Sequence, residues 1–374
     1  MVSRDKLAIF VELLRQYPLW RTRIKEAMMQ RTRWLRGAGK KRVRAMQSDN
    51  QQAIGRQVIR AGVIGAGAFG RLHAQKYAGL PGVKLVGIAD VSEVRAQTLA
   101  NDFGVTAFAG WRAMLPHVDI VTIAAPARFH GEIGVGCLNQ GKHIFIEKPL
   151  AANMREADAL VRVAEARGAV LHTGHQERFV MRYLGLFDSK VKPLRIETHR
   201  AAPFNPRNTD VSVVLDLMIH DIDLAHQLNA EEIVSVEATE RSGPARSDEV
   251  SANLRLADGM EISLFASRMA EARKRFMRVT YPDGEIYIDF LTREMTNTTP
   301  RVIKSLNSQG EAIDGMPCPS VDPLGHGVAQ FVRAVRERRP AAIQPQEARR
   351  ALETALKILD AAKAPAIQKR LVHA

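Results

Sequence analysis

Lys148, Asp216 and His220 carry functional groups that can move a proton to or from a substrate hydroxyl. Asp216 and His220 are four residues apart, so on a helix they share one face, with Asp223 a further turn along. A carboxylate in that position can orient an imidazole, and histidine has a pKa suited to accepting a proton near neutrality. Lys148 follows a short apolar run, and its ammonium can offset negative charge as an alkoxide forms.

These residues also admit structural interpretations. A helical Asp/His pair fits a capped histidine in a core, and a lysine at a strand end is commonly an ordinary surface residue. The acidic residues around His220, which are Asp216, Asp221 and Asp223, suggest metal ligands. No further ligand cluster accompanies them, so no metal is expected.

A glycine-rich turn at 65–70 (GAGAFG) lies between a β-branched run at 58–64 and a helical stretch at 71–77. In such a turn the first glycine allows a tight bend, the second lets the backbone approach a pyrophosphate, and the third permits close helix packing. Asp90 closes the next strand, 83–89, where its carboxylate can accept hydrogen bonds from ribose hydroxyls. The expected dinucleotide contacts are Gly65, Gly67, Ala68, Phe69, Gly70 and Asp90.

Asp90 favours NAD over NADP as the cofactor. Its carboxylate repels a 2′-phosphate, and neither Val91 nor Ser92 supplies an arginine to bind one. Arg95 lies one helical turn further on and can fold back toward the site, so NADP remains the alternative. A purely structural turn, with Asp90 as a helix cap, also remains open.

The elements that must position these residues alternate between strand and helix up to about 149–152. Apolar runs at 119–124 and 144–147 continue a parallel βαβ series. Beyond 194 strand patterns dominate, separated by turn pairs such as Asp258-Gly259 and Asp283-Gly284. The later strands are expected at 194–200, 233–239, 251–256, 261–267, 273–281 and 285–288, and helices at 324–338 and 345–364.

The pattern predicts an α/β protein, in which an N-terminal Rossmann doubly wound parallel sheet precedes an α+β domain. The domain boundaries are placed at 1–56 for a basic extension, 57–150 for the dinucleotide-binding domain, and 151–374 for a substrate-binding and oligomerisation domain. No apolar run long enough to span a membrane and no secretory signal is evident, which predicts a soluble, cytoplasmic protein. Cys137 and Cys318 form no disulfide framework and are expected to be reduced.

The net charge of +14 is concentrated at the N-terminus. Residues 1–57 hold 14 lysines and arginines against 4 acidic residues, so this segment carries +10 and the remainder +4. Basic residues are not interleaved with aromatic ones in the body of the chain, and no nucleic-acid-binding signature occurs. Nucleic acid is therefore not an expected partner.

The N-terminal extension combines basic residues with apolar ones at helical spacing. Leu7, Phe10, Val11 and Leu14 predict an amphipathic helix, which suits weak contact with an anionic membrane surface. The alternative is a flexible, solvated tail. Met46 is a further candidate start of the chain, which would leave the upstream stretch untranslated.

Glu147-Lys148-Pro149, at the end of a predicted strand, and the glycine turn together resemble the Gfo/Idh/MocA family. That family takes its name from glucose-fructose oxidoreductase, inositol dehydrogenase and rhizopine catabolism. Ala125-Pro126 with His130 is similar to the family's turn near the nicotinamide, and 216–220 (DLMIH) is similar to its Asp-xxx-His element. The resemblance covers 58–367.

The resemblance implies that Lys148, Asp216 and His220 form the catalytic group. His220 and Lys148 would take the hydroxyl proton while a hydride passes to the nicotinamide. The further cofactor contacts that it implies are Pro126, His130, Glu147 and Lys148. It also implies a large, mostly antiparallel C-terminal sheet whose outer face makes dimer or tetramer contacts.

The segment 174–179 (GHQERF) resembles family members that oxidise the 3-hydroxyl of UDP-N-acetylated hexoses, with UDP-N-acetylglucosamine favoured. Their 3-keto products are precursors of amino sugars, including that of lipid A. The implied substrate contacts are Glu177, Arg178 and His220. The segment 180–182 (VMR) departs from the Asn-Pro pair that is common at this point in those proteins.

A UDP-sugar carries two phosphates, which bidentate arginine contacts would suit. The cationic candidates are Arg178, Arg182, Arg200 and Arg207, with Arg178 favoured. Two other functions remain open. One is a dehydrogenase of free sugars or inositol-type polyols, which needs no phosphate-binding arginine. The other is a non-catalytic sugar-nucleotide sensor, because fold alone does not establish chemistry.

Overall fold

The computed structural model of the protein describes residues 58–188, 191–205, 211–243, 248–301, 304–306, 312–314 and 322–363. The described fold begins at Ile59 and belongs to one compact unit. The predicted N-terminal extension with its amphipathic segment lies outside the described residues, as do Arg207 and Cys318.

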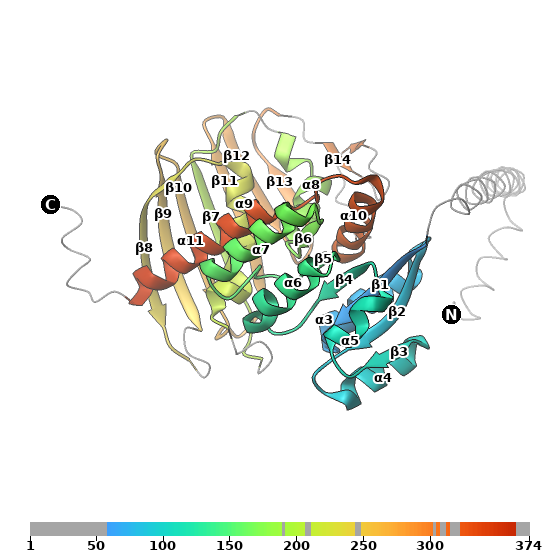
Figure 1. Ribbon diagram of the computed structural model, residues 1–374. Coiled ribbons are helices and arrows are strands. Elements are labelled where there is room, and N and C mark those ends of the chain that lie inside the picture. The colour runs from blue at the N-terminus through green and yellow to red at the C-terminus, as the bar shows by residue number, and fades with distance from the viewer. Residues whose placement is uncertain are drawn as a thin grey trace, which may run out of the picture. The chain divides into compact units, whose positions relative to one another are not determined.

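A six-stranded parallel sheet forms the first half of the fold, which confirms the predicted Rossmann domain (Figure 1). Its strands are β1 (Ile59–Ile64), β2 (Val83–Ala89), β3 (Thr106–Phe108), β4 (Ile120–Ile123), β5 (His143–Ile146) and β6 (Leu171–Thr173). They lie in the order β3-β2-β1-β4-β5-β6, so the sheet extends past the predicted boundary at 150. The connecting helices are α3 (Ala68–Gly79), α4 (Glu93–Phe103), α5 (Trp111–Met114), α6 (His130–Asn139) and α7 (Met154–Arg167), with short turns η1 (Leu115–His117) and η2 (Ala127–Phe129).

The strand order places the predicted site residues at one edge. It reverses between β1 and β4, and ligands of open α/β sheets bind at the carboxyl ends of the strands near such a reversal. Gly65 follows β1, Asp90 follows β2 and Lys148 follows β5. The polar residues therefore meet because parallel strands end on the same side.

A seven-stranded sheet forms the second half, with the order β13-β12-β11-β7-β10-β9-β8. Its strands are β7 (Arg195–Ala201), β8 (Ile233–Arg241), β9 (Glu249–Leu256), β10 (Glu261–Ser267), β11 (Lys274–Tyr281), β12 (Gly284–Asp289) and β13 (Glu294–Asn297). Only β7 and β10 pair in parallel among these strands, so the mostly antiparallel sheet is confirmed. Gly259 and Gly284 have positive φ angles of 88° and 143° at the two predicted turns, a region that favours glycine. A small separate pair is formed by β14 (Lys304–Leu306) and β15 (Ala312–Asp314).

Helices cover one face of the larger sheet (Figure 1). The helical segments of this half are α8 (Glu177–Tyr183), η3 (Leu186–Asp188), the π-helical turn η4 (Val214–Met218), α9 (Ile219–Leu228), α10 (Pro323–Glu337) and α11 (Pro345–Lys363). Contacts of α9 with β10 and of α11 with β8 and β9 fix this face as the inner one. We call the opposite face, where side chains such as those of Glu237 and Asn253 are exposed, the outer face of the sheet.

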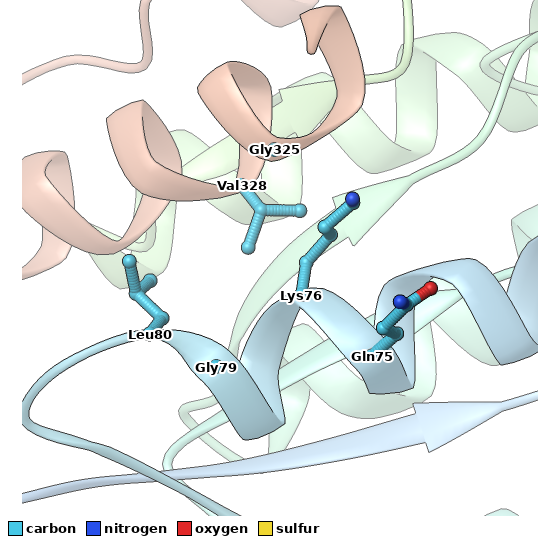
Figure 2. Close-up of a pocket in the computed structure, with 6 residues that line it drawn as sticks. All are labelled: Gln75, Lys76, Gly79, Leu80, Gly325 and Val328. Atoms are coloured by element: carbon cyan, nitrogen blue, oxygen red, sulfur yellow. The ribbon is translucent and has the colours of Figure 1, made fainter. Parts of the chain in front are cut away.

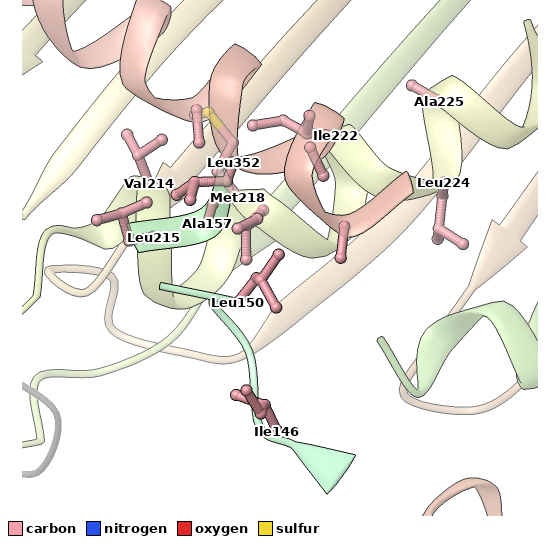
Figure 3. Close-up of a cluster of buried hydrophobic side chains, with 14 of the residues drawn as sticks. Ile146, Leu150, Ala157, Val214, Leu215, Met218, Ile222, Leu224, Ala225 and Leu352 are labelled. Carbon is pink, nitrogen blue, oxygen red and sulfur yellow. The ribbon is translucent and has the colours of Figure 1, made fainter. Parts of the chain in front are cut away.

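One continuous hydrophobic cluster packs beneath the residues around Lys148 and Asp216 (Figure 3). Ile146 ends β5, Leu150 follows the Lys148 loop, and Met218 ends the π-helical turn, and all three are buried in this cluster. Leu352 of α11 packs into it as well. Burying such a side chain contributes about 1.5–3 kcal/mol, so this packing holds the strand end and the turn together. Cys137 is also buried in this cluster and forms no disulfide.

Two surface hollows lie apart from the predicted site residues. One of about 310 Å³ lies between α3 and α10 (Figure 2), and its Lys76 is paired with Asp322 at 2.7 Å. The other, of about 860 Å³, lies along α5 and α6. The volumes of these two hollows therefore do not identify the position of the predicted active site. No helix in the described part of the chain is long and apolar enough to cross a membrane.

Candidate active site

The glycine turn has the geometry that a dinucleotide pyrophosphate needs. Gly65 has a φ of +100°, and its N–H donates to Ala89 O at 2.8 Å. A Cβ on Gly70 would lie 1.8 Å from Gly65 O, so α3 packs directly on the turn. A Cβ on Gly67 would meet nothing within 4 Å, and no side chain caps α3 at this residue. The open space at an uncapped helix N-terminus fits a phosphate-bearing cofactor.

Asp90 is tied to the same turn. Its carboxylate accepts hydrogen bonds from the N–H of Ala66 at 2.7 Å, from the N–H of Ser92 at 2.8 Å and from Arg95 at 2.7 Å. Burial acts to raise the pKa of Asp90, but the bonds from Arg95 and the two N–H groups outweigh it and hold the pKa below its ordinary value. Arg95 folds back as the sequence allowed, yet its side chain is 58% exposed and can swing aside for a ribose.

Lys148 and Asp216 form a direct ion pair between the two halves of the fold. Lys148 Nζ donates to Asp216 Oδ1 at 2.8 Å and to the backbone O of the same residue at 2.7 Å. Each side chain is 13% exposed. Asp216 lies in the π-helical turn that leads into α9, and such turns often occur at functional sites because they break the regular hydrogen-bond ladder. The structure therefore brings together two members of the predicted catalytic group.

The expectation that Asp216 orients His220 is wrong. Its carboxylate is taken by the Lys148 ammonium, a charged donor, and lies 3.8 Å from Arg268 on its other oxygen. His220 is partly buried, and its Nδ1 has no hydrogen-bond partner among the described residues. Burial first, and then the charges of Lys148 and Arg200, hold the pKa of His220 well below 6.5. The imidazole is therefore neutral at neutral pH and able to accept a proton.

Two predicted cofactor contacts have structural partners instead. The ring nitrogens of His130 lie 2.8 Å from Ala125 O and 2.8 Å from Pro149 O, so this buried histidine joins the turn after β4 to the loop after Lys148. Glu147 Oε1 lies 2.7 Å from Nε2 of His73 on α3. Both residues hold the turn in place, whereas Pro126 is exposed beside them, with no obstacle to a direct cofactor contact.

Arg178, the arginine favoured for phosphate binding, instead forms buried ion pairs within the protein. Its guanidinium is 7% exposed and donates to both oxygens of Asp223 and to Glu347, the latter at 2.7 Å. The expectation that Arg178 binds substrate is therefore not supported, since Arg178 and Asp223 neutralise each other in the interior. Glu177 is 18% exposed and is bonded to Arg200 at 3.0 Å, which leaves it a candidate substrate contact. Arg200 is buried and donates hydrogen bonds to Asp221, whereas Arg182 is exposed.

We expect Arg178→Ala to lower the free energy of unfolding by about 3–5 kcal/mol, because Asp223 would remain as a buried, uncompensated charge. Urea denaturation measures the change. The control is Arg182→Ala on the same helix, whose exposed side chain should contribute less than about 0.5 kcal/mol. A variant of Arg178 that keeps its stability but loses substrate affinity would restore the original assignment.

Three residues near the site were missed as functional candidates by the sequence reasoning. Arg268 lies 3.8 Å from Asp216, and Arg275 lies beside Arg200 in the pairing of β11 with β7. His175 is buried, its ring centre lies 6.4 Å from that of His220, and neither of its nitrogens has a hydrogen-bond partner among the described residues, although Nδ1 lies 3.8 Å from Asp223 Oδ2. Burial first lowers the pKa of His175 and keeps it neutral. Only His175 stood in a recognised segment, and the two arginines carry no local signal.

A nucleotide-binding turn beside a lysine and a neutral histidine that can accept a hydroxyl proton defines a nicotinamide-dependent oxidoreductase. Comparison with known proteins agrees. Residues 59–175 match the model of the oxidoreductase family with an NAD-binding Rossmann fold, and residues 190–287 match the GFO/IDH/MocA C-terminal domain. The chain belongs to the Gfo/Idh/MocA family of NAD-binding oxidoreductases.

Individual relatives extend the comparison over the described fold. UDP-N-acetylglucosamine 3-dehydrogenase of Acidithiobacillus ferrooxidans is 34% identical over 315 residues, which cover 82% of this chain and 98% of that protein. Its solved structure, named GnnA, has a TM-score of 0.73 at 33% identity over the same shares of both chains. Myo-inositol 2-dehydrogenase of Thermotoga maritima is 31% identical, but over 48% of this chain and 58% of its own.

Proposed function

We propose that this protein oxidises the 3-hydroxyl of a UDP-N-acetylated hexose, with UDP-N-acetylglucosamine as the favoured substrate. The observation that carries the proposal is the Lys148–Asp216 pair beside a neutral His220, in a chain that matches a UDP-N-acetylglucosamine 3-dehydrogenase over 98% of that relative's length. The 3-keto product belongs to the class of substrates that aminotransferases convert to 3-amino sugars, which would place the reaction before an amino-sugar step such as that of lipid A.

The proposed division of labour follows from the charges. NAD, held by the turn at Gly65 to Gly70 and by Asp90, supplies the hydride acceptor. Lys148 donates a hydrogen bond to the substrate oxygen and offsets its developing negative charge, while His220 accepts the proton. Asp216 orients the Lys148 ammonium through the hydrogen bond of 2.8 Å between Nζ and Oδ1. Glu177 is partly exposed and can accept a hydrogen bond from a sugar hydroxyl.

The test combines purified protein, NAD and UDP-N-acetylglucosamine with a 3-keto-sugar aminotransferase and glutamate, which pull the equilibrium forward. NADH absorbance together with a 3-amino sugar nucleotide in the mass spectrum is the expected result. Turnover of free inositols alone would favour a polyol dehydrogenase. NAD binding without any turnover would favour a sugar-nucleotide sensor.

We expect kcat/KM for alcohol oxidation to stay level as the pH falls through 6.5 and to decline only at lower pH. A protonated imidazole cannot accept the hydroxyl proton, and the pKa of His220 lies well below 6.5 because of burial and of Lys148. Lys148→Met removes a positive neighbour and should move the pKa of His220 upward, which NMR titration can follow without turnover. An acidic limb centred at 6.5 in the wild-type protein would contradict this assignment.

We further propose that the chain forms a homo-oligomer through the outer face of the seven-stranded sheet. Four rings, Phe265, His199, Phe276 and Tyr287, stack in a row across adjacent strands there, with centroids 4.5, 5.6 and 5.4 Å apart. Such a row suits contact with the same face of a second copy. Light scattering should give a multiple of the chain mass for the wild type and a lower mass for Phe276→Glu; a monomeric wild type excludes this interface.

A further inference from the structure

Arg275 is a partly buried arginine for which the described residues supply no ion-pair partner. Its Nε is buried and makes no hydrogen bond to any described residue, and no carboxylate in the described ranges reaches salt-bridge distance. The buried arginines of this region each bond to a carboxylate or a backbone carbonyl, as Arg200 does with Asp221 and Arg268 does with Val211 O. A partly buried cation with a buried, unbonded Nε is disfavoured unless a ligand supplies the missing contact.

The position of Arg275 is set by strand pairing. Arg275 is opposite Arg200 in the antiparallel pairing of β11 with β7. It has the same strand parity as Met277 and Val279, whose buried side chains point to the inner face. Asp221 of α9 meets Arg200 on that face, and His220 precedes it in the helix. Arg275 therefore lies on the side of the sheet where α9 presents His220.

The charges around Arg275 disfavour an unliganded cation. Burial is the largest cause that lowers the pKa of Arg275, and the neighbouring Arg200 lowers it further. Glu177 and Asp221 act in the opposite direction, but both carboxylates are hydrogen-bonded to Arg200. Arg273 is a further cation nearby. An oxyanion bound here could accept hydrogen bonds from the guanidinium of Arg275.

We propose that Arg275 forms, next to His220, a subsite for an oxyanion of the substrate, either the diphosphate or a carboxylate on the sugar. This inference rests on the proposed function, since it assigns the anion of a sugar nucleotide to a particular side chain. A planar guanidinium binds both groups through two parallel hydrogen bonds, so the local chemistry is shared. The two sources differ in which substrates depend on Arg275.

The experiment compares Arg275→Met and Arg275→Lys with wild type at saturating NAD. Substrates are UDP-N-acetylglucosamine and its 6-carboxylate counterpart, and UDP serves as an inhibitor that carries the diphosphate without a sugar. Arg275→Met should weaken binding of the recognised anion by about ten- to hundredfold, the loss expected for hydrogen bonds to a charged group. Arg275→Lys should lie between, because the charge stays but the fork is lost. Arg333→Met, an exposed arginine on α10, is the control.

The pattern of losses identifies the source of the oxyanion. A higher KM for both sugars with weaker UDP inhibition places the diphosphate at Arg275. A higher KM for the carboxylated sugar alone, with UDP inhibition unchanged, places the 6-carboxylate there. Unchanged constants for all three ligands overturn the proposal.

Two further measurements separate this inference from its alternatives. If Arg275 only balances Glu177 and Asp221, Arg275→Met should unfold at a distinctly lower temperature, which would overturn the subsite. Our expectation is an equal or higher unfolding temperature. If the wild type oxidises no UDP-sugar, the proposed function fails, and calorimetry on NADH-loaded protein with UDP, inorganic pyrophosphate and the 6-carboxylated UDP-sugar decides separately. Loss of binding of any of these ligands in Arg275→Met then supports the subsite. Unchanged binding of all three in Arg275→Met, or no binding of any of them to the wild type, overturns it.

Discussion

His220→Ala is expected to lower kcat for alcohol oxidation by about 10²–10⁴-fold, the usual contribution of a positioned general base. Its imidazole is held neutral by burial and by Lys148, and therefore accepts a proton at neutral pH. The NAD affinity should remain close to that of the wild type, because the glycine turn and Asp90 are on other elements. Single-turnover formation of NADH and direct titration of NADH binding measure the two quantities.

Lys148→Met should produce a loss of similar size, and the double variant should lose little more than either single one. Groups that act on the same proton transfer are strongly non-additive. His117→Ala is the control, because this histidine is exposed at the end of the short turn η1. Nearly normal turnover in His220→Ala would remove His220 from the proton path and leave Lys148 as the base. Unimpaired behaviour of both variants would support a sensor.

The parallel sheet was predictable because β1, β2 and β5 are marked by mainly apolar runs that are followed by a glycine or an acidic residue. The run at 83–89 corresponds to β2, and the turn pairs at Gly259 and Gly284 separate antiparallel strands as expected. The strands β3 and β6 were not predicted, because each has three residues and too few positions for a period to show. Placement of Lys148 at the site edge followed from topology alone.

The partners of charged residues were much less predictable than their elements. Lys148 and Asp216 are 68 residues apart, and Arg178 meets Glu347 across 169 residues. Local spacing favoured a pairing of Asp216 with His220, but in the structure Asp216 lies in the π-helical turn and bonds to Lys148, a charged donor from the loop after β5. A single sequence does not encode such pairings in any local pattern. Arg178 was for the same reason assigned to substrate although Asp223 neutralises it in the interior.

The buried polar residues behind the glycine turn show how the framework constrains the cofactor site. His73 links Glu147 to Thr122 at 2.7 and 3.2 Å, and Tyr77 OH lies 2.8 Å from the Thr122 hydroxyl. This hydrogen-bonded network connects α3, β4 and the residue after β5 through buried groups. A satisfied buried network of this kind fixes one arrangement of its elements. The turn at Gly65 is therefore held in place by residues that do not themselves touch the cofactor.

Gly67→Ala is expected to weaken NAD binding, whereas Gly70→Ala is expected to destabilise the fold. A methyl group on Gly67 meets nothing within 4 Å, and the φ of −77° suits alanine, so the fold should keep its stability. The NAD affinity should nevertheless fall by about ten- to hundredfold, as expected when hydrogen bonds to a charged pyrophosphate are lost. A methyl group on Gly70 would lie 1.8 Å from Gly65 O, so Gly70→Ala should lower the free energy of unfolding by about 3 kcal/mol or more.

Thermal unfolding and NADH titration distinguish a cofactor cradle from a merely tight turn. Gly79→Ala is the matched control, because a Cβ at the far end of α3 also meets nothing within 4 Å but is remote from the turn. If Gly67→Ala binds NADH as well as Gly79→Ala does, the space at Gly67 is not where the pyrophosphate lies. If Gly67→Ala unfolds as easily as Gly70→Ala, its loss of affinity reports instability. Only loss of affinity at unchanged stability identifies Gly67 as the point where backbone and cofactor come into contact.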